Sequence, residues 1–455
     1  MSDFSELIPC ETLESMFGLV KASACFAEVP RWNLASAYER PTNLGRYSFA
    51  ALQKPLDLKT LCTHRSLAVN RLLFNTYEQN SLFLPPTQLT EEAQKAFQDY
   101  YAPSLVATTA FLRPRVEQAC FSFLDSEIEV EGPWTADSFA DYAQERVAQY
   151  ERTASVTCER VEKAAHPNLA ARLFLLQVAP DFLSEASQMA RALPGNFGVL
   201  HSELTKIFID EFGYGVHPTK HSTLFERTLE SVGLASGIHA HYYWYLPTSL
   251  LLTSYFHLLT SNKQRWFEYL GALYWIEAVV PHFNRQFSRL LKRQFGPDVN
   301  TQYFDEHVGI DMHHRRMVLD RLIRPMVATY GEQILPAMVR GLEASRLLGD
   351  VAEQDFLEQM DFSEALLTER LPVTGADRVQ AKSHAAGYFF EPQVEDDTFT
   401  FAVHSGRVEV DGGYLTPAVL EAGQAVRVPA GRLFGARVVE GEALVSRERK
   451  SAPPV

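Results

Sequence analysis

The segment EHVGIDMHHRR, residues 306–316, limits the possible folds of this chain more than any other segment. His307, Asp311 and His314 are spaced at i, i+4 and i+7, so an α-helix would place all three on one face. That face continues to Leu322, which indicates that it points toward a protein interior. Buried imidazoles and carboxylates need partners, and one bound cation would satisfy all three. The segment therefore predicts a buried, metal-binding helix; the alternative is a polar helix face on which histidines happen to cluster.

Length and composition predict a globular, multidomain protein. At roughly 150 residues per domain, 455 residues suggest about three domains. The net charge of -14 argues against nucleic acid or an anionic membrane as the main partner. The five cysteines are scattered without a CxxC pair, which predicts reduced thiols. Neither a secretory signal nor an uninterrupted apolar span is visible, so we expect a cytoplasmic protein with no membrane contact.

The hydrophobic patterns divide the chain into three regions and predict a mainly α fold. Residues 1–130 alternate helical patterns with Pro-marked turns, and the acidic stretch 125–134, which contains Gly and Pro, marks the boundary at their end. Residues 131–370 hold long amphipathic segments, whose spacing suits a bundle of about six or seven helices. Residues 371–455 switch to short alternating runs between Gly and Asp turns, which predict a small β-barrel or sandwich.

A metal site on a helical bundle needs carboxylates from other helices. Glu277 lies on an apolar helix face, and Glu211 follows an apolar turn of the segment that later supplies His221. Glycines and a proline at 213–218 interrupt that segment, so its backbone break could re-aim His221 toward the site. Glu185 lies one turn after an aromatic residue. Taken singly, each of these carboxylates is more often a surface group.

Together, these residues resemble a known family. The strings DEFGYG and KHSTLF and the helix with the histidine triplet resemble the haem-oxygenase-like di-iron oxidases, in particular their multidomain N-oxygenase branch. That branch includes enzymes that form nitrosoureas and 2-nitroimidazoles. The resemblance covers nearly the whole chain and implies a helical N-terminal dimerisation region, a haem-oxygenase-like di-iron bundle and a C-terminal cupin barrel. It also implies seven metal ligands: Glu185, Glu211, His221, Glu277, His307, Asp311 and His314.

The implied cofactor is a pair of irons that cycles between Fe(II) and Fe(III). Carboxylates and imidazoles suit Fe(II), and a carboxylate can bridge two metals. Haem is not implied, because these carboxylates would crowd the cavity that a macrocycle needs. By resemblance, dioxygen is the co-substrate, an external electron donor is required, and oxygen is transferred to a nitrogen of a small-molecule amine. A homodimer and a reductase or small-molecule reductant are implied as partners.

The C-terminal region departs from the metal-binding cupin pattern. Such a cupin needs a His-x-His pair on an early strand and another His after a Pro-x-Gly turn. The turn is present at 429–431, but Phe434 stands near the later His position, and residues 388–397 contain no His-x-His. His404 lies by the following turn. We therefore expect a metal-free cupin, and products that stop at a hydroxylamine, nitroso or nitro compound. The leading hypothesis is oxidation of a guanidine-like substrate, most specifically 2-aminoimidazole to 2-nitroimidazole.

Other interpretations stay open from sequence. The same iron site could hydroxylate the guanidine of L-arginine or a derivative, or oxidise carbon in a fatty acid as a decarboxylase or desaturase. A non-enzymatic sensor that binds its ligand in the barrel is a third possibility. The pair His239 and His241 has His-x-His spacing but lies in an expected helix, where residues two apart diverge. The aromatic run 242–245 either lines a substrate pocket or packs in the core.

Overall fold

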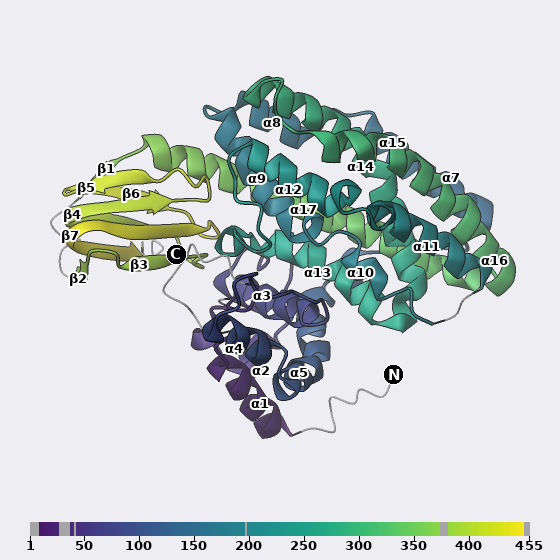
Figure 1. Ribbon diagram of the computed structural model, residues 1–455, viewed down its shortest axis with the longest axis horizontal. Coiled ribbons are helices and arrows are strands. Elements are labelled where there is room, and N and C mark those ends of the chain that lie inside the picture. The colour runs from purple at the N-terminus through teal and green to yellow at the C-terminus, as the bar shows by residue number, and fades with distance from the viewer. Residues whose placement is uncertain (1–8, 27–36, 41, 196–197, 374–380, 450–455) are drawn as a thin grey trace.

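The computed structural model describes residues 9–26, 37–40, 42–195, 198–373 and 381–449. The chain is mainly helical, with an antiparallel sheet at its C-terminal end (Figure 1). The N-terminal helices lie against one side of a larger helical bundle, and the sheet lies at one end of that bundle. The mainly α prediction with a terminal β region is confirmed. The segment 374–380, next to the predicted boundary at residue 371, lies outside the described residues.

The N-terminal region is helical. Its longest described helices are α3 and α5, and α3 is buried along nearly its whole length because it packs against both α5 and α13 of the bundle. The side chain of Thr63 caps α3 by accepting a hydrogen bond from the backbone N–H of Ser66. The helices of this region are α1 (Cys10–Ala22), α2 (Phe49–Leu52), α3 (His64–Glu78), α4 (Glu91–Tyr100), α5 (Pro103–Phe121) and α6 (Leu124–Glu127).

The bundle begins at α7, after the acidic boundary stretch. Thr135 and Ser138 form a reciprocal capping box that fixes where α7 starts. The described part of 131–370 contains eleven α-helices, more than the six or seven expected, because several turns divide the amphipathic segments into shorter helices; seven of the eleven have thirteen residues or more. The bundle helices are α7 (Ala136–Glu151), α8 (Val156–Lys163), α9 (Pro167–Phe182), α10 (Ser187–Ala190), α11 (Val199–Glu211), α12 (His221–Ser231), α13 (Pro247–Ser261), α14 (Trp266–Phe295), α15 (Gln302–Arg316), α16 (Arg324–Tyr330) and α17 (Leu335–Thr368).

Two glycines allow the longest helices, α14 and α17, to touch. A Cβ atom built on Gly271 would lie 1.8 Å from the backbone oxygen of Met338, and one on Gly341 would lie 1.8 Å from that of Glu268. Only a residue without a side chain permits this approach. The close contact holds α14, which carries Glu277, in a fixed place against the bundle core.

The C-terminal sheet has seven antiparallel strands in the described residues. Its central path runs β1-β6-β4-β7-β2, with β3 beside β7 and β5 beside β4. Inward-facing residues of β4, β6 and β7 form an apolar core that includes Phe434, the residue near the later histidine position of the metal-binding pattern. The strands are β1 (Leu371–Pro372), β2 (Lys382–Ala385), β3 (Phe389–Gln393), β4 (Phe399–Asp411), β5 (Ala418–Glu421), β6 (Gln424–Val428) and β7 (Phe434–Arg449). The sheet fits a small cupin-like barrel; its metal-free state stays a prediction.

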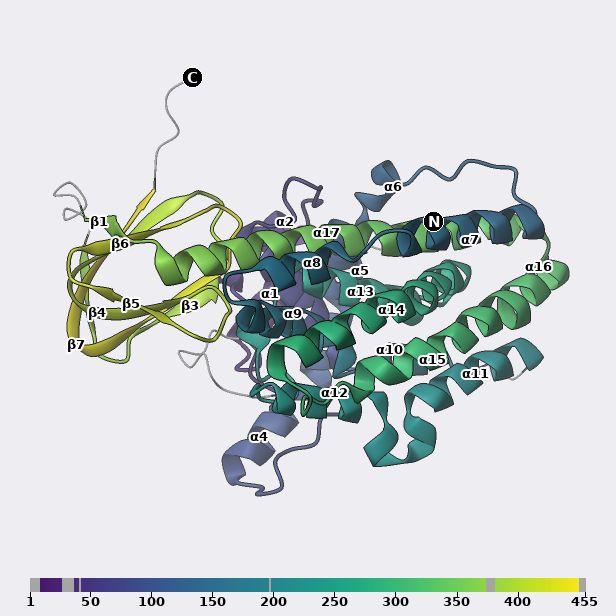
Figure 2. The same ribbon diagram turned by 90° about the horizontal axis from the view of Figure 1, so that it is seen from above.

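Helix α17 connects the bundle to the sheet and runs along both (Figure 2). The amide nitrogen of Gln359 donates to the backbone oxygens of Gly412, at 2.7 Å, and Leu433, at 2.8 Å. The Ser363 hydroxyl also donates to Gly412, and Phe362 packs in the core of the sheet. These contacts hold the C-terminal end of α17 against the barrel. The domain limits 1–130, 131–370 and 371–455 stay predictions.

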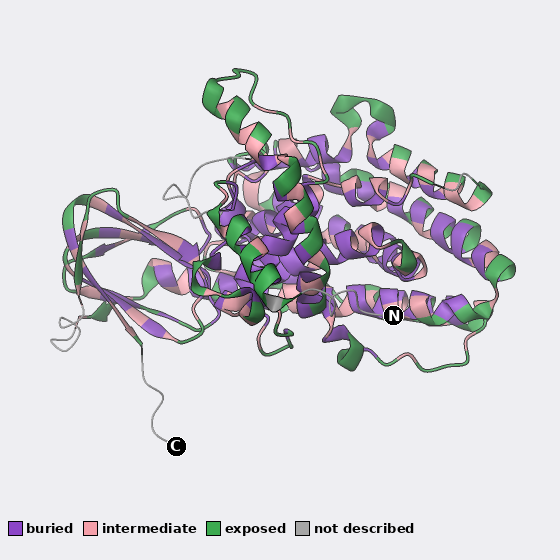
Figure 3. Cartoon of the chain, turned by 90° about the horizontal axis from the view of Figure 1, so that it is seen from below, coloured by how far each residue is buried: buried purple, intermediate pink, exposed green. Residues whose placement is uncertain are grey.

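The residues at the centre of the helical part are almost all buried, and exposed residues lie toward its outside (Figure 3). The cysteines whose side chains are described, Cys25, Cys62, Cys120 and Cys158, are free thiols, as predicted. The side chain of Cys10 lies outside the description. Among the helices of the described residues, none combines the length and the apolar character needed to cross a membrane.

Candidate metal centre

The histidine triplet lies on α15, as its spacing predicted. His307, Asp311 and His314 are buried, whereas the neighbouring His313 is exposed. Helix α15 ends in basic residues, which is favourable at a helix C-terminus. A π-helical segment, Met317–Ile323, follows directly. Such segments are rare and frequently adjoin functional sites.

Glu277 faces the triplet from α14. Its side chain is buried, with Oε2 3.2 Å from His314 Nδ1. Pro281 lies four residues later in the same helix and has no N–H to donate to the carbonyl of Glu277. The carboxylate therefore projects from a part of α14 where the helical hydrogen-bond ladder lacks one bond.

Glu211 and His221 come together through the backbone break that the sequence indicated. Helix α11 ends at Glu211, and α12 begins at His221. Gly213 between them has φ +55°, and a Cβ there would lie 2.5 Å from the backbone nitrogen of Lys220. The tight turn places His221 Nδ1 2.5 Å from Glu211 Oε2. The break thus re-aims His221 toward Glu211, as the sequence suggested it could.

Glu185 lies in the turn that follows α9. The next residue, Ala186, has φ +59°, and this left-handed conformation breaks the helix between α9 and α10. The hydroxyl of Tyr303 donates to Glu185 Oε1 at 3.0 Å, and that oxygen lies 3.1 Å from His307 Nε2. A residue of α15 thereby fixes the carboxylate beside the triplet.

The structure brings all seven predicted residues into two groups that share Glu211. Each group has four residues whose ligand atoms lie within 4.8 Å of one another. Glu185 Oε2 and Asp311 Oδ1 are buried with no hydrogen-bond partner among the described residues, and Glu211 Oε2 and His221 Nδ1 face each other at 2.5 Å. Unpartnered buried polar atoms are costly, and a cation between them would satisfy them. The groups are Glu185, Glu211, His221 and His307, and Glu211, Glu277, Asp311 and His314.

Hydrogen bonds on the outer side orient the two histidines of α15. His307 Nδ1 donates to the backbone oxygen of Tyr303 at 2.6 Å, so Nε2 faces the carboxylates. In His314 the roles are reversed: Nε2 donates to Asp210 Oδ2 at 3.1 Å, and Nδ1 faces Glu277 and Glu211. Asp210 was not among the sequence predictions, although it directly precedes Glu211. Partners of this kind fix the tautomer and the ring orientation of metal-binding histidines.

The carboxylates change the acidity of the buried histidines. Burial alone would lower the pKa of His307, but Glu185 and Asp311 outweigh it and raise the pKa well above its ordinary value. Burial likewise opposes protonation of His314, yet Glu277 and Glu211 raise its pKa to about 12. Burial raises the pKa of Asp311. The cluster therefore attracts positive charge, which protons or metal ions can supply.

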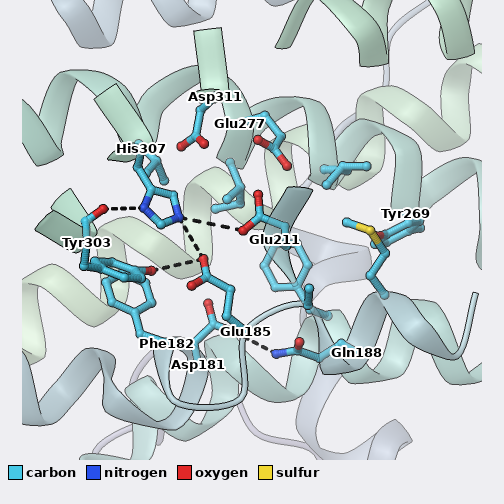
Figure 4. A pocket seen from close by; sticks show the side chains of 16 residues that line it. Asp181, Phe182, Glu185, Gln188, Glu211, Tyr269, Glu277, Tyr303, His307 and Asp311 are labelled. Carbon is cyan, nitrogen blue, oxygen red and sulfur yellow. Dashed lines mark hydrogen bonds and ion pairs between the residues drawn. The ribbon is translucent and has the colours of Figure 1, made fainter. Parts of the chain in front are cut away.

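A cavity of about 110 Å³ is lined by residues of both groups (Figure 4). For comparison, a cavity of about 150 Å³ engineered into another protein holds one benzene molecule, so this cavity is smaller. Its wall includes Asp181, whose Oδ1 accepts a hydrogen bond from Gln188 Nε2 at 2.7 Å. Burial and the neighbouring Glu185 raise the pKa of Asp181 to about 7. The sequence predictions missed Asp181, although it lies four residues before Glu185, the same step that relates His307 to Asp311.

The second histidine pair lies away from this site. His239 and His241 are buried in a turn, so the helical interpretation of this segment is wrong. His239 Nε2 lies 3.1 Å from Glu78 Oε2, and His241 Nε2 donates to the backbone oxygen of Ala235. The aromatic residues 242–245 are all part of the bundle core, as the packing interpretation expected.

These observations define a redox enzyme of the iron-containing, haem-oxygenase-like class. Residues 172–347, which include all seven candidate ligands, match the family model for iron-containing redox enzymes. A nitrosourea synthase from Streptomyces achromogenes subsp. streptozoticus is 39% identical over 398 residues, which cover 84% of this chain and 83% of that protein. The chain belongs to this family of haem-oxygenase-like iron enzymes, and it is an oxidoreductase.

Proposed function

We propose that this protein is a di-iron, dioxygen-dependent N-oxygenase that oxidises the amino group of a small guanidine-like molecule. The most specific form of the proposal is conversion of 2-aminoimidazole to 2-nitroimidazole. The observation that carries it is the pair of four-residue groups joined by Glu211 beside a cavity sized for one small ring. Similarity to an enzyme named for making a nitrosourea, a product with an oxidised nitrogen, supports the choice of nitrogen as the atom attacked.

In this proposal the seven residues hold two irons. Glu185, His221 and His307 would hold one, through His307 Nε2, and Glu277, Asp311 and His314 the other, through His314 Nδ1. Glu211 would contribute one oxygen to each, because its Oε1 lies 3.3 Å from His314 Nδ1 and its Oε2 2.5 Å from His221 Nδ1. Carboxylates and imidazoles are a donor set that suits Fe(II).

When bound, the iron pair would supply the activation of dioxygen for transfer to nitrogen. The first oxidation places one oxygen atom in an N–H bond to give a hydroxylamine, and the other oxygen leaves as water. This step consumes two electrons and two protons, so an external donor is required. The protein residues fix the metal ligands, shield them from bulk water and hold the amine in the adjoining cavity. A homodimer, a reductase or small-molecule reductant, and a cytoplasmic location complete the proposal.

The test is turnover by anaerobic, Fe(II)-loaded protein on mixing with reductant, 2-aminoimidazole and isotopically heavy dioxygen. We expect heavy oxygen in the hydroxylamine, nitroso or nitro product, detected by mass spectrometry. His314→Ala should lose the iron of its own group and all turnover, while His313→Ala, an exposed neighbour on the same helix, should keep both irons and full turnover. Absence of product from protein with confirmed iron content, with either 2-aminoimidazole or L-arginine, would refute the proposal.

A further inference from the structure

Asp181 is the acidic residue of the cavity that the metal groups leave unused. It lies in the last turn of α9, and Gln188 donates to one of its carboxylate oxygens. Among the described residues, no Lys, Arg or His forms an ion pair with Asp181. In Figure 4, Asp181 and Gln188 lie below Glu185, on the side of the cavity away from Asp311. Asp181 therefore lines the cavity without being one of the seven candidate metal ligands.

The charges around the cavity leave Asp181 without a counterion. The wall holds five carboxylates and no Lys or Arg. Four of the five, Glu185, Glu211, Glu277 and Asp311, belong to the metal groups, and two divalent irons would balance them. The fifth, Asp181, remains without a positively charged partner among the described residues. Asp181 is half-buried, and a cation that entered the cavity would stabilise the charged form of its carboxyl group.

The rest of the wall limits what that cation can be. The cavity is only about 110 Å³, and its lining includes the rings of Phe182, Phe256, Tyr269 and Tyr303. Aromatic rings favour flat groups by stacking and cations by interaction with the ring face. A compact metal ion or a flexible ammonium would leave these rings without a complementary surface. A small, planar cation with several N–H donors fits the carboxylate, the amide and the rings together.

We propose that Asp181 binds the positive charge of the substrate, an amidinium or guanidinium group, and so holds the amino nitrogen toward Glu185 and Glu211. This inference rests on the proposed function and adds the residue that selects the substrate. The carboxylate accepts N–H bonds from the cation, with one oxygen already anchored by Gln188. Asp181 is a recognition and positioning residue, outside the metal ligand set.

The test measures binding without dioxygen, so that no turnover is needed. Fe(II)-loaded protein is titrated anaerobically, by calorimetry, with 2-aminoimidazole and with 2-imidazolone, a neutral compound in which oxygen replaces the amino group. Asp181→Asn should weaken binding of 2-aminoimidazole by about tenfold or more, as expected for loss of a hydrogen bond to a charged group. Binding of 2-imidazolone should change less than about twofold, because the amide keeps the shape of the site.

Two controls separate this role from others. Glu306→Gln removes the same charge from an exposed position on α15 and should leave both affinities unchanged. Iron content of Asp181→Asn should equal that of the wild type, and Asp181→Glu should recover part of the affinity for 2-aminoimidazole. Equal losses for both compounds, no loss for either, loss of iron, or a wild type without preference for the cation would each overturn the inference. Charge-selective binding that depends on Asp181, without any oxidation on adding dioxygen, would instead overturn the proposed function.

Discussion

Replacement of Glu211 by Gln should remove both irons, whereas replacement of a residue from one group should remove one. Glu211 Oε1 faces His314 and Oε2 faces His221, so each group of four loses one ligand and one shared negative charge. Even residues that only support metal ligands cost about 10–100-fold in affinity when mutated, or about 1.4–2.8 kcal/mol. A direct ligand should cost each iron at least this much. We expect about two irons per wild-type chain, about one in Glu185→Gln and near zero in Glu211→Gln.

The assay is anaerobic reconstitution with Fe(II), removal of free metal, and measurement of iron and protein in the same sample. Circular dichroism must show that each variant keeps its helical content. Glu306→Gln, on the exposed side of α15, serves as the charge-matched control and should keep both irons. If Glu211→Gln lost no more iron than Glu185→Gln, the carboxylate would not be shared. The assignment of two metals joined by Glu211 would then be wrong.

Three further predictions test the support of the site and of the fold. Asp210→Ala should lower iron affinity about 10–100-fold because His314 loses its outer hydrogen bond, and metal titration with a competing chelator measures this. The raised pKa values of His307 and His314 favour protonated rings at neutral pH, and these rings must lose protons to bind metal. Iron binding should therefore release protons, and iron affinity should rise with pH. Calorimetry in buffers of different ionisation enthalpy measures the proton release. Gly341→Ala should lower the free energy of unfolding by about 1–3 kcal/mol or more, because the new Cβ would clash with a carbonyl of α14. Gly349→Ala, on the same helix but with no atom near its Cβ position, should raise it by up to about 1 kcal/mol. Thermal unfolding of both variants measures the difference.

The order of the structural regions could be predicted from hydrophobic patterns. The change from long amphipathic segments to short alternating runs after residue 370 corresponds to the step from α17 to the sheet. What the patterns could not predict is the close contact between α14 and α17. It depends on Gly271 and Gly341, which are far apart in sequence and look like ordinary helix-weakening residues until the two helices are placed together.

The site was predictable where one regular element carries it and only partly where the backbone is irregular. The spacing of His307, Asp311 and His314 follows from the period of a helix, and α15 has that period. His221 reaches the site through the positive φ of Gly213, and Glu185 through a turn, so no periodicity relates them to α15. For these two positions, resemblance to a family provided the prediction that local geometry could not.

The size and charge of the cavity constrain the substrate more closely than the metal residues do. A long fatty acid needs an apolar tunnel, and its carboxylate would meet five acidic residues in a space of about 110 Å³. The guanidinium of L-arginine carries a positive charge that Asp181 could bind. Its α-carboxylate, however, would need a positively charged partner, and the cavity wall has no Lys or Arg. That part of the molecule would have to lie outside the cavity. A ring such as 2-aminoimidazole brings one positive charge and no negative one, and its whole surface can be enclosed. These properties favour it as the first substrate to be tested.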